Sequence, residues 1–250
     1  GPPEPFAVPA ASHKAMTSVP EPAATAVPRT CAEVNLGAIV RNYQSLRRIL
    51  GDGVEVVAVV KANAYGHGAE PVAKALSAAG CGWFAVACLE EGVGLREAGI
   101  AGEILVLGGF LPGEEATGCR HRLTPHIHSR GQLLRWNAEA ASASTTSAST
   151  RPVYHIELDT GMHRMGWDGL DAQPLAEDLA GAIEQATRAD FHGLATHLAS
   201  AENFRSDQTQ RQNERFQSTL RHLESLDIRP PHTHVANSAA ALYRPSLGGD

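Results

Sequence analysis

The apolar run V-E-V-V-A-V-V at residues 54–60 ends abruptly at Lys61, so a single amine stands where a buried strand should stop. A run this rich in β-branched side chains is typical of a strand covered on both faces, as in the parallel sheets of α/β proteins. In a (β/α)8 barrel, active sites are built at the carboxyl-terminal ends of the strands. A lysine partly removed from water there favours its neutral amine, which can attack a carbonyl group.

The residues after Lys61 decide between two interpretations of this lysine. One is a side chain that closes a strand and extends into solvent. The other is a reactive amine, and the following A-N-A-Y-G-H-G favours it. These residues predict a polar βα turn punctuated by glycine, the kind of loop on which a rigid scaffold carries function.

Composition and charge narrow the class of protein. With 250 residues, of which 43% are apolar, the chain can bury one large core or two small ones, and the strand spacing favours one. A net charge of −6 gives no electrostatic reason to bind nucleic acid or an anionic membrane. The four cysteines lack zinc or disulfide spacing, and no segment has the ~20 apolar residues of a membrane span. We therefore expect a cytoplasmic protein.

The chain divides into two regions. Residues 1–30 are rich in proline and alanine, so we expect them to be disordered, either as a native extension or as a remnant of protease cleavage. From Cys31 onwards, apolar strands alternate with amphipathic helices. The tract A-S-A-S-T-T-S-A-S-T at residues 141–150 interrupts this alternation, and we expect it to be a mobile loop.

The alternation predicts a barrel. A short strand at 32–36 leads into a helix at 36–50, and barrel strands begin near residues 54, 83, 103, 123, 153, 190 and 232. Helices are expected between them, at about 67–79, 89–98, from 112, and at 130–141, 171–187 and 205–226. This spacing predicts a (β/α)8 TIM-type barrel that stops after its seventh strand. Because an open barrel exposes two strand edges, we expect a fragment or a chain that a partner completes.

Five segments in order carry a family resemblance. The string V-V-K-A-N-A-Y-G-H-G at 59–68 is accompanied by similar motifs at 32–43, 158–166, 196–202 and 234–242. Together they resemble the alanine racemases, fold-type III enzymes that use pyridoxal 5'-phosphate. The resemblance implies that residues 31–250 form the N-terminal barrel domain of such an enzyme, incomplete at its carboxyl end and without the family's C-terminal β-domain.

The resemblance assigns cofactor-binding residues. It implies that Lys61 carries the cofactor and also serves as the base on one face of the substrate. Tyr65 would bind the cofactor phosphate, although its ring can instead pack beneath the loop. Asn237 and Ser238 follow a strand where a helix starts, so Ser238 is a candidate for phosphate binding, for capping the helix, or for both.

The same resemblance points to Arg164 and His197. Arg164 would bond the phenolic oxygen of the cofactor near the substrate carboxylate, and His197 would stack on its pyridine ring. Their alternatives are a solvated loop arginine and a core histidine. Many family members carry a carbamylated lysine where this chain has Glu157, so we expect Glu157 to orient Arg164 through a charged pair, unless Glu157 faces outward and Asp159 is the inward acid. His234 is expected to face inward in a supporting role.

The histidines around residues 123–127 invite a metal interpretation. His121, His126 and His128 alternate there without a fourth ligand at a suitable spacing, so we do not expect a metal site from them.

The resemblance also implies a function. It implies racemisation of L- and D-alanine in a homodimer, which would supply D-alanine for peptidoglycan. The family's second base, a tyrosine from the C-terminal domain of the other subunit, would lie beyond Asp250. The chain alone is therefore expected to bind the cofactor weakly and to racemise little. Three alternatives stay open: a non-catalytic barrel that binds pyridoxal phosphate, a decarboxylase of basic amino acids, and a racemase of serine or of broader specificity.

Overall fold

The computed structural model describes residues 30–143, 151–168, 171–244 and Leu247. It separates residues 1–34 from residues 35–250, and the architecture below is that of the second unit. The disorder expected for residues 1–30 falls almost entirely outside the described residues. The helix expected at 130–141 extends to Ala143, and the rest of the 141–150 tract is also outside them.

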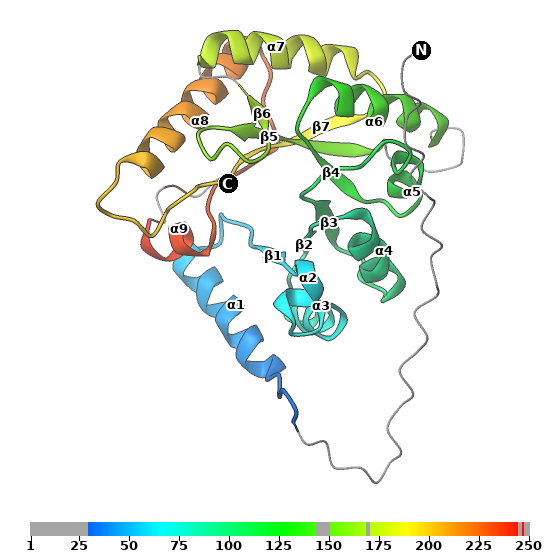
Figure 1. Cartoon of the computed structure of the whole chain (residues 1–250), viewed down its shortest axis with the longest axis vertical. Coiled ribbons are helices and arrows are strands. Elements are labelled where there is room, and N and C mark those ends of the chain that lie inside the picture. Colours follow the sequence, from blue (N-terminus) through cyan, green and yellow to red (C-terminus); the bar gives the residue numbers. More distant parts are fainter. Residues whose placement is uncertain (1–29, 144–150, 169–170, 245–246, 248–250) are drawn as a thin grey trace, which may run out of the picture. The chain divides into compact units, whose positions relative to one another are not determined.

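Seven strands pair side by side, all parallel, in a strongly curved sheet (Figure 1). Their order along the sheet is β1-β2-β3-β4-β5-β7-β8, and the two-residue β6 pairs with β5 off this path. The bounds are β1 Val57–Val59, β2 Trp83–Val86, β3 Glu103–Val106, β4 Thr124–Ile127, β5 Val153–Asp159, β6 Trp167–Asp168, β7 Asp190–Thr196 and β8 His232–His234. The seven expected barrel strands and the truncated barrel are thus confirmed.

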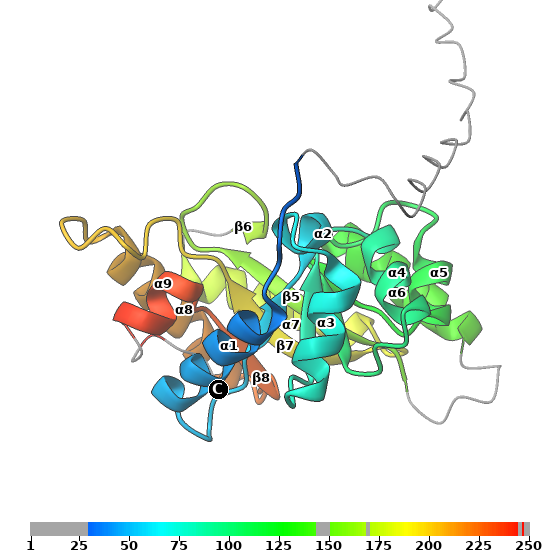
Figure 2. The same cartoon turned by 90° about the horizontal axis from the view of Figure 1, so that it is seen from below.

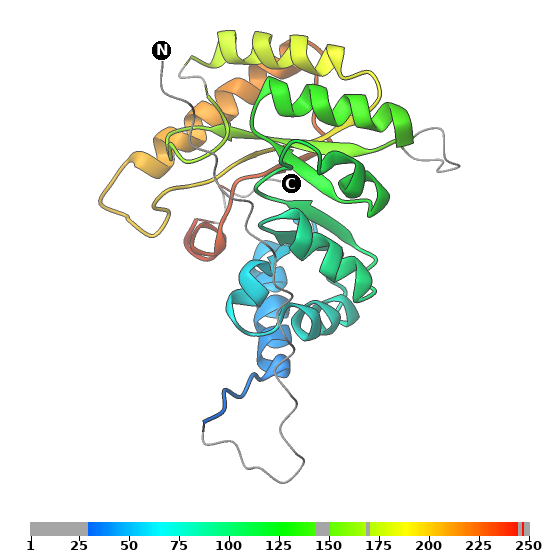
Figure 3. The ribbon, with the colours of Figure 1, turned by 45° about the vertical axis from the view of Figure 1, so that its right-hand side comes forward.

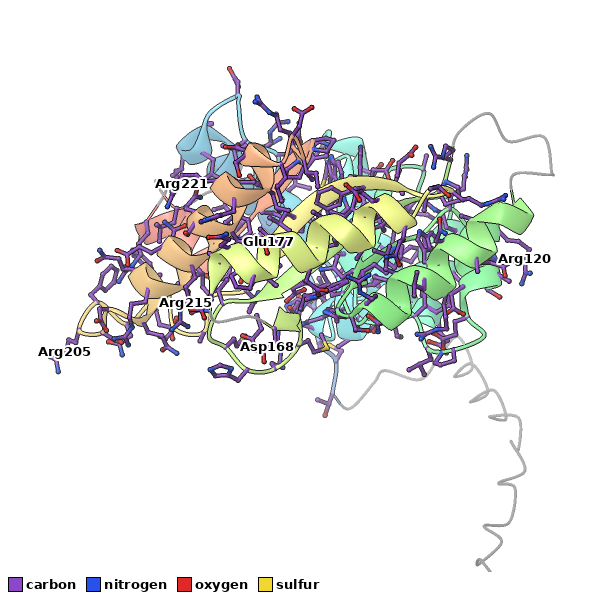
Figure 4. All side chains as sticks on the ribbon, turned by 90° about the horizontal axis from the view of Figure 1, so that it is seen from above. Arg120, Asp168, Glu177, Arg205, Arg215 and Arg221 are labelled. Atoms are coloured by element: carbon purple, nitrogen blue, oxygen red, sulfur yellow. The ribbon has the colours of Figure 1, made fainter. Side chains whose placement is uncertain are left out.

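Helices cover the outer side of the curved sheet (Figure 3). Their bounds are α1 Leu36–Leu50, α3 Ala69–Ala78, α4 Leu89–Glu97, α5 Glu115–Arg120, α6 Arg130–Ala143, α7 Ala172–Gln185, α8 Gln208–Ser225 and α9 Ser238–Tyr243. The segment labelled α2, Lys61–Tyr65, contains residues with left-handed backbone angles and is a turn. Figure 4 shows α6, α7 and α8 side by side, with Glu177 on α7 and Arg221 on α8. No helix of the described residues is both long enough and apolar enough to span a bilayer.

The strand expected at 32–36 is wrong. Residues 31–35 form no strand, and α1 begins directly at Leu36. The physical reason is a helix cap, because the Asn35 side-chain oxygen accepts a hydrogen bond from the backbone N–H of Ala38 at 2.9 Å. Such a cap satisfies one of the free N–H groups of a first helical turn.

The hydrophobic core lies between the sheet and the helices. On β5, Tyr154, Ile156 and Leu158 belong to this core and are almost completely buried. Since side chains alternate along a strand, His155 and Glu157 point to the opposite side, into the barrel. The barrel interior is therefore polar at this level, whereas the apolar packing that holds the fold together is outside the sheet.

The two edge strands are not bonded to each other. Within the described residues, β1 pairs only with β2 and β8 only with β7. Figure 2 shows α1 and α9 on this open side, where the two helices pack against each other. Because β1 is an edge strand, Val59 keeps 39% of its surface exposed, so the expectation of a strand buried on both faces is only partly correct.

A single glycine, Gly102, allows a close approach at the start of β2 and β3. The Gly82 carbonyl oxygen accepts the backbone N–H of Glu103 at 2.8 Å. A Cβ added at Gly102 would lie 2.4 Å from that same oxygen, which no side-chain movement can relieve. The first residues of the β2–β3 ladder therefore require glycine at position 102.

We predict that Gly102→Ala lowers the free energy of unfolding by about 1–3 kcal/mol, because it forces the two strands apart. Chemical denaturation measures this loss. Gly94→Ala is the matched control: a Cβ at Gly94 on α4 meets no atom within 4 Å, and alanine favours a helix by about 0.8–1.0 kcal/mol over glycine. Equal stability of the two variants would contradict this packing.

Candidate active site at the carboxyl-terminal rim

The predicted site residues follow different strands at one end of the sheet. Lys61 comes after β1, Arg164 after β5, His197 after β7, and the pair Asn237 and Ser238 after β8. Because these strands are all parallel, their carboxyl ends form a single rim, and the sequence-predicted residues share it.

His197 responds electrostatically to its neighbours on this rim. Burial lowers the pKa of His197, and the positive charge of Arg164 lowers it further. The Glu157 carboxylate raises this pKa, and the ammonium of Lys61 opposes that effect. The imidazole therefore favours its neutral form, and it lies within electrostatic reach of Lys61 and Arg164.

Lys61 leads into a left-handed turn. The four residues after it, none of them glycine, have φ angles of 50° to 55°: Ala62, Asn63, Ala64 and Tyr65. Side chains disfavour this conformation by about 1–2 kcal/mol per residue. Such strain persists only where surrounding contacts impose it, and it is concentrated at functional sites.

Glu91 and Asn63 hold this turn in place. One Glu91 carboxylate oxygen accepts the backbone N–H of Ala62 at 2.7 Å, and the other accepts that of Ala87 at 2.8 Å. The carboxylate thereby ties the turn to the residue after β2. The Asn63 side-chain oxygen accepts the backbone N–H of Ala69 at 2.8 Å, where α3 begins. Sequence reasoning did not identify Glu91.

Tyr65 projects outward from the turn. Its side chain is among the exposed apolar ones, with 61% of the residue surface accessible. The alternative in which its ring packs beneath the loop is therefore wrong. The phenol is available to a ligand at the rim.

The loop that carries Arg164 is held at its start. One Asp159 carboxylate oxygen accepts the backbone N–H groups of three successive residues at 2.9–3.0 Å: Gly161, Met162 and His163. Burial raises the pKa of Asp159, but these hydrogen bonds outweigh it and the pKa is lowered. Arg215 of α8, which Figure 4 labels near this loop, donates to the Thr160 carbonyl at 2.9 Å. Arg164 itself is exposed and forms no ion pair with the described residues.

Glu157 does not pair with Arg164, so that expectation is wrong. The carboxylate is buried inside the barrel, where one oxygen lies 2.8 Å from Nδ1 of His126. The alternative of an outward Glu157 is wrong as well. The reason is proximity: β4 and β5 are neighbours, and a buried carboxylate takes the nearest donor. Burial raises the pKa of Glu157, but the hydrogen bond and charge of His126 outweigh it, so the pKa is lowered.

Asn237 and Ser238 occupy different positions at the start of α9. The Asn237 side-chain oxygen accepts the backbone N–H of Ala240 at 3.0 Å, so Asn237 is the N-cap. The capping role considered for Ser238 is therefore wrong. Ser238 is the first residue of α9 and is exposed, which leaves its hydroxyl free for a ligand.

Histidines fill the barrel interior below the rim. Of these, the sequence predicted only His234 to face inward. Nδ1 of His155 on β5 lies 2.8 Å from Nε2 of His234 on β8. Burial lowers the pKa of His155 well below its usual value and that of His234 to about 3. The patterns H-x-E at 155–157 and H-x-H at 232–234 were the available signal, because alternate residues of a strand share a face.

The chain is similar to one family along most of its length. A family model described as "Alanine racemase, N-terminal domain" matches residues 34–249. Among curated proteins, the alanine racemase of Carboxydothermus hydrogenoformans is 38% identical over 219 residues, and that of Geobacillus stearothermophilus is 39% identical over 217. These alignments cover 88% and 86% of this chain but 56% and 53% of the relatives. The chain thus spans about half the length of the curated relatives it matches.

Solved structures agree with this similarity. An alanine racemase of Clostridium difficile superposes with a TM-score of 0.80 at 27% identity, over 86% of this chain and 54% of that one. An alanine racemase of Bacillus anthracis with bound L-Ala-P superposes with a TM-score of 0.74 at 32% identity, over 84% of this chain and 52% of that one.

We predict that Ala62→Gly raises the free energy of unfolding by about 0.5–1 kcal/mol, because glycine adopts the left-handed conformation without steric cost. Thermal or urea denaturation measures the gain. Ala75→Gly in α3, an ordinary right-handed helix, is the control and should lose about 0.5–1 kcal/mol. A loss at both positions would show that the turn is unstrained.

The buried histidines predict acid sensitivity. Unfolded histidines take up protons below about pH 6.5, whereas the folded His155 and His234 resist them, so stability falls as the pH drops from about 6.5 towards the folded values. Each such histidine removes up to about 1.4 kcal/mol per pH unit in that window. The charges that face His234 come from His126 on β4 and His232 on β8.

Urea denaturation at about pH 7.5 and about pH 5 measures this slope. His234→Gln should make the slope shallower, and His121→Asn, which changes a ring outside the group, should leave it unchanged. Equal stability of the wild type at both pH values would contradict the prediction.

Proposed function

Because the chain belongs to the alanine racemase family, we propose that it is the N-terminal barrel domain of a pyridoxal-phosphate-dependent enzyme that interconverts L- and D-alanine. One observation carries the proposal beyond family membership. Lys61 stands at the carboxyl end of β1, before a strained turn. The charges of Lys61 and Arg164 both lower the pKa of the His197 imidazole. A positioned amine and a guanidinium around a neutral imidazole suit a small anionic substrate.

The residues of the rim fit the cofactor chemically. Pyridoxal phosphate, when bound, withdraws electrons from an attached amino acid and makes its α-proton acidic. It presents an aldehyde, an aromatic ring and a phosphate. Lys61 has the amine for the aldehyde, His197 a half-buried flat ring, and Tyr65 and Ser238 exposed hydroxyl groups for the phosphate.

Each residue has a separate task in this proposal. Lys61 would hold the cofactor covalently, and once the amino group of the substrate has taken its place there, the freed Nζ would move a proton on one face of the amino acid. The planar fork of Arg164 would bind an oxygen of the cofactor near the substrate carboxylate. His197 would pack on the cofactor ring, and Asn237, which caps α9 through the Ala240 N–H, would order the helix start from which Ser238 would bind the phosphate.

Inversion at carbon needs a second acid–base group on the opposite face. We assign none within residues 31–250, and propose that the family's tyrosine, from the C-terminal domain of a second subunit, takes this role. The homodimer, a cytoplasmic location and the supply of D-alanine for peptidoglycan belong to the same proposal. Residues 31–250 alone should bind the cofactor weakly and racemise little, and joining them to the C-terminal domain should restore turnover.

Covalent trapping tests the central role of Lys61. The chain has three lysines, at positions 14, 61 and 74. We predict that borohydride reduction in the presence of pyridoxal phosphate attaches the cofactor to Lys61, as mapped by peptide mass spectrometry, and that Lys61→Ala loses this label. Lys74→Ala is the matched control, because Lys74 lies on α3 and is paired with Glu70 at 2.6 Å.

Labelling that persists in Lys61→Ala, or that favours Lys74, would overturn the assignment of Lys61. A second result separates the enzyme from a non-catalytic carrier of the cofactor. If the chain joined to the C-terminal domain of an alanine racemase binds the cofactor at Lys61 yet racemises neither enantiomer of alanine, the racemase proposal is wrong.

A further inference from the structure

Three histidines from three strands meet inside the barrel. They are His126 on β4, His155 on β5 and His234 on β8, and one ring nitrogen of each lies within 4.8 Å of the corresponding nitrogens of the other two. The rings are close in space as well, with centroid separations of 5.1–5.9 Å. Neither His126 nor His155 has a task in the racemase proposal, and His234 was expected to have only a supporting one.

We propose that His126, His155 and His234 form a binding site for a divalent transition-metal ion of the zinc class. Zinc binds imidazole nitrogens at 2.0–2.1 Å with tetrahedral geometry. Three nitrogens on one such ion lie about 3.3 Å apart, by that geometry. Ring nitrogens that lie within 4.8 Å of one another would move to this separation on binding the ion, and the 2.8 Å contact between Nδ1 of His155 and Nε2 of His234 would open if either of those nitrogens coordinates it.

Two unpartnered atoms support the site. Nε2 of His126 and Nε2 of His155 are buried, and neither has a hydrogen-bond partner within the described part of the chain. Leaving a buried polar atom unsatisfied costs about 1–3 kcal/mol. Coordination would remove this cost for a nitrogen that faces the ion.

Glu157 prepares His126 for a metal. A carboxylate only accepts hydrogen bonds, so the 2.8 Å contact requires a proton on Nδ1 of His126. In the neutral imidazole, the lone pair then resides on Nε2, the unpartnered atom. A carboxylate that orients a histidine in this way is the usual second partner of zinc-binding histidines.

The backbone of β7 leaves room for the imidazole of His155. A Cβ added at Gly193 on β7 would lie 2.3 Å from Nδ1 of His155, so the imidazole packs directly on a position without a side chain. The indole of Trp83 lies on another side, with its ring centroid 6.0 Å from that of His155. Ligands from β4, β5 and β8 would tie an edge strand to the middle of the sheet.

The sequence suggested a different set of histidines, His121, His126 and His128, for a metal. His121 follows α5, outside the group, and Nε2 of His128 lies 2.9 Å from the Leu107 carbonyl. Only His126 is common to both sets. The other two ligands come from strands 29 residues or more away in sequence, which spacing alone does not reveal.

Metal titration of the full chain tests the proposal without the cofactor. Protein stripped with a chelator is titrated with Zn²⁺ by calorimetry and with Co²⁺ by visible absorbance, and one equivalent of each should bind. His126→Asn and His234→Asn should each lower the affinity at least 100-fold, and Glu157→Gln about 10- to 100-fold. His121→Asn is the matched control and should bind as the wild type does. Circular dichroism checks that each variant folds.

X-ray absorption of the wild-type zinc complex decides the result even if variants fail to fold. Three imidazole ligands around the ion would support the site. Absence of stoichiometric binding, fewer than three imidazoles, or full affinity in His126→Asn would overturn it. No measurement here uses pyridoxal phosphate or alanine, so failure of the metal proposal leaves the racemase proposal untouched. Failure of the racemase proposal likewise leaves the metal proposal untouched.

Discussion

Parallel pairing of the seven strands from β1 to β8, the short β6 aside, is the constraint on which the rest of the structure depends. It brings the ends of β1, β5, β7 and β8 to one rim, so residues as distant in sequence as Lys61 and Ser238 share an edge of the sheet. It also sets which side chains face inward. A slip of one residue on β5 would exchange His155 and Glu157 for Tyr154 and Ile156, and so would bury polar groups among the helices.

The fold separates stability from chemistry. The apolar core between sheet and helices supplies the driving force, whereas the barrel interior carries imidazoles and a carboxylate that are costly to bury. Glu157 connects the two chemical regions of the interior. It holds His126 by a direct hydrogen bond, and its charge also favours protonation of His197 at the rim. A change at Glu157 therefore acts on both regions, through geometry in one and through electrostatics in the other.

Local strain marks the point where sheet and site meet. Four residues in the left-handed region follow Lys61, and the turn keeps this shape because Glu91 bonds both to it and to the end of β2. The amine is thus positioned by the backbone and by a neighbouring strand. The loop of Arg164 is organised in the same manner, since Asp159 holds its start through three backbone N–H groups.

The sequence by itself determined the seven strands, most helices and the membership of the rim, because hydrophobic periodicity and short motifs are local properties. It misassigned residues 32–36, where one side-chain cap on α1 outweighed strand propensity. Only the tertiary structure decided the partner of Glu157, the exposure of Tyr65 and Val59, and the meeting of His126, His155 and His234. These depend on which strands are neighbours and which strand is an edge, and pairing between distant segments is not encoded in the spacing of residues along the chain.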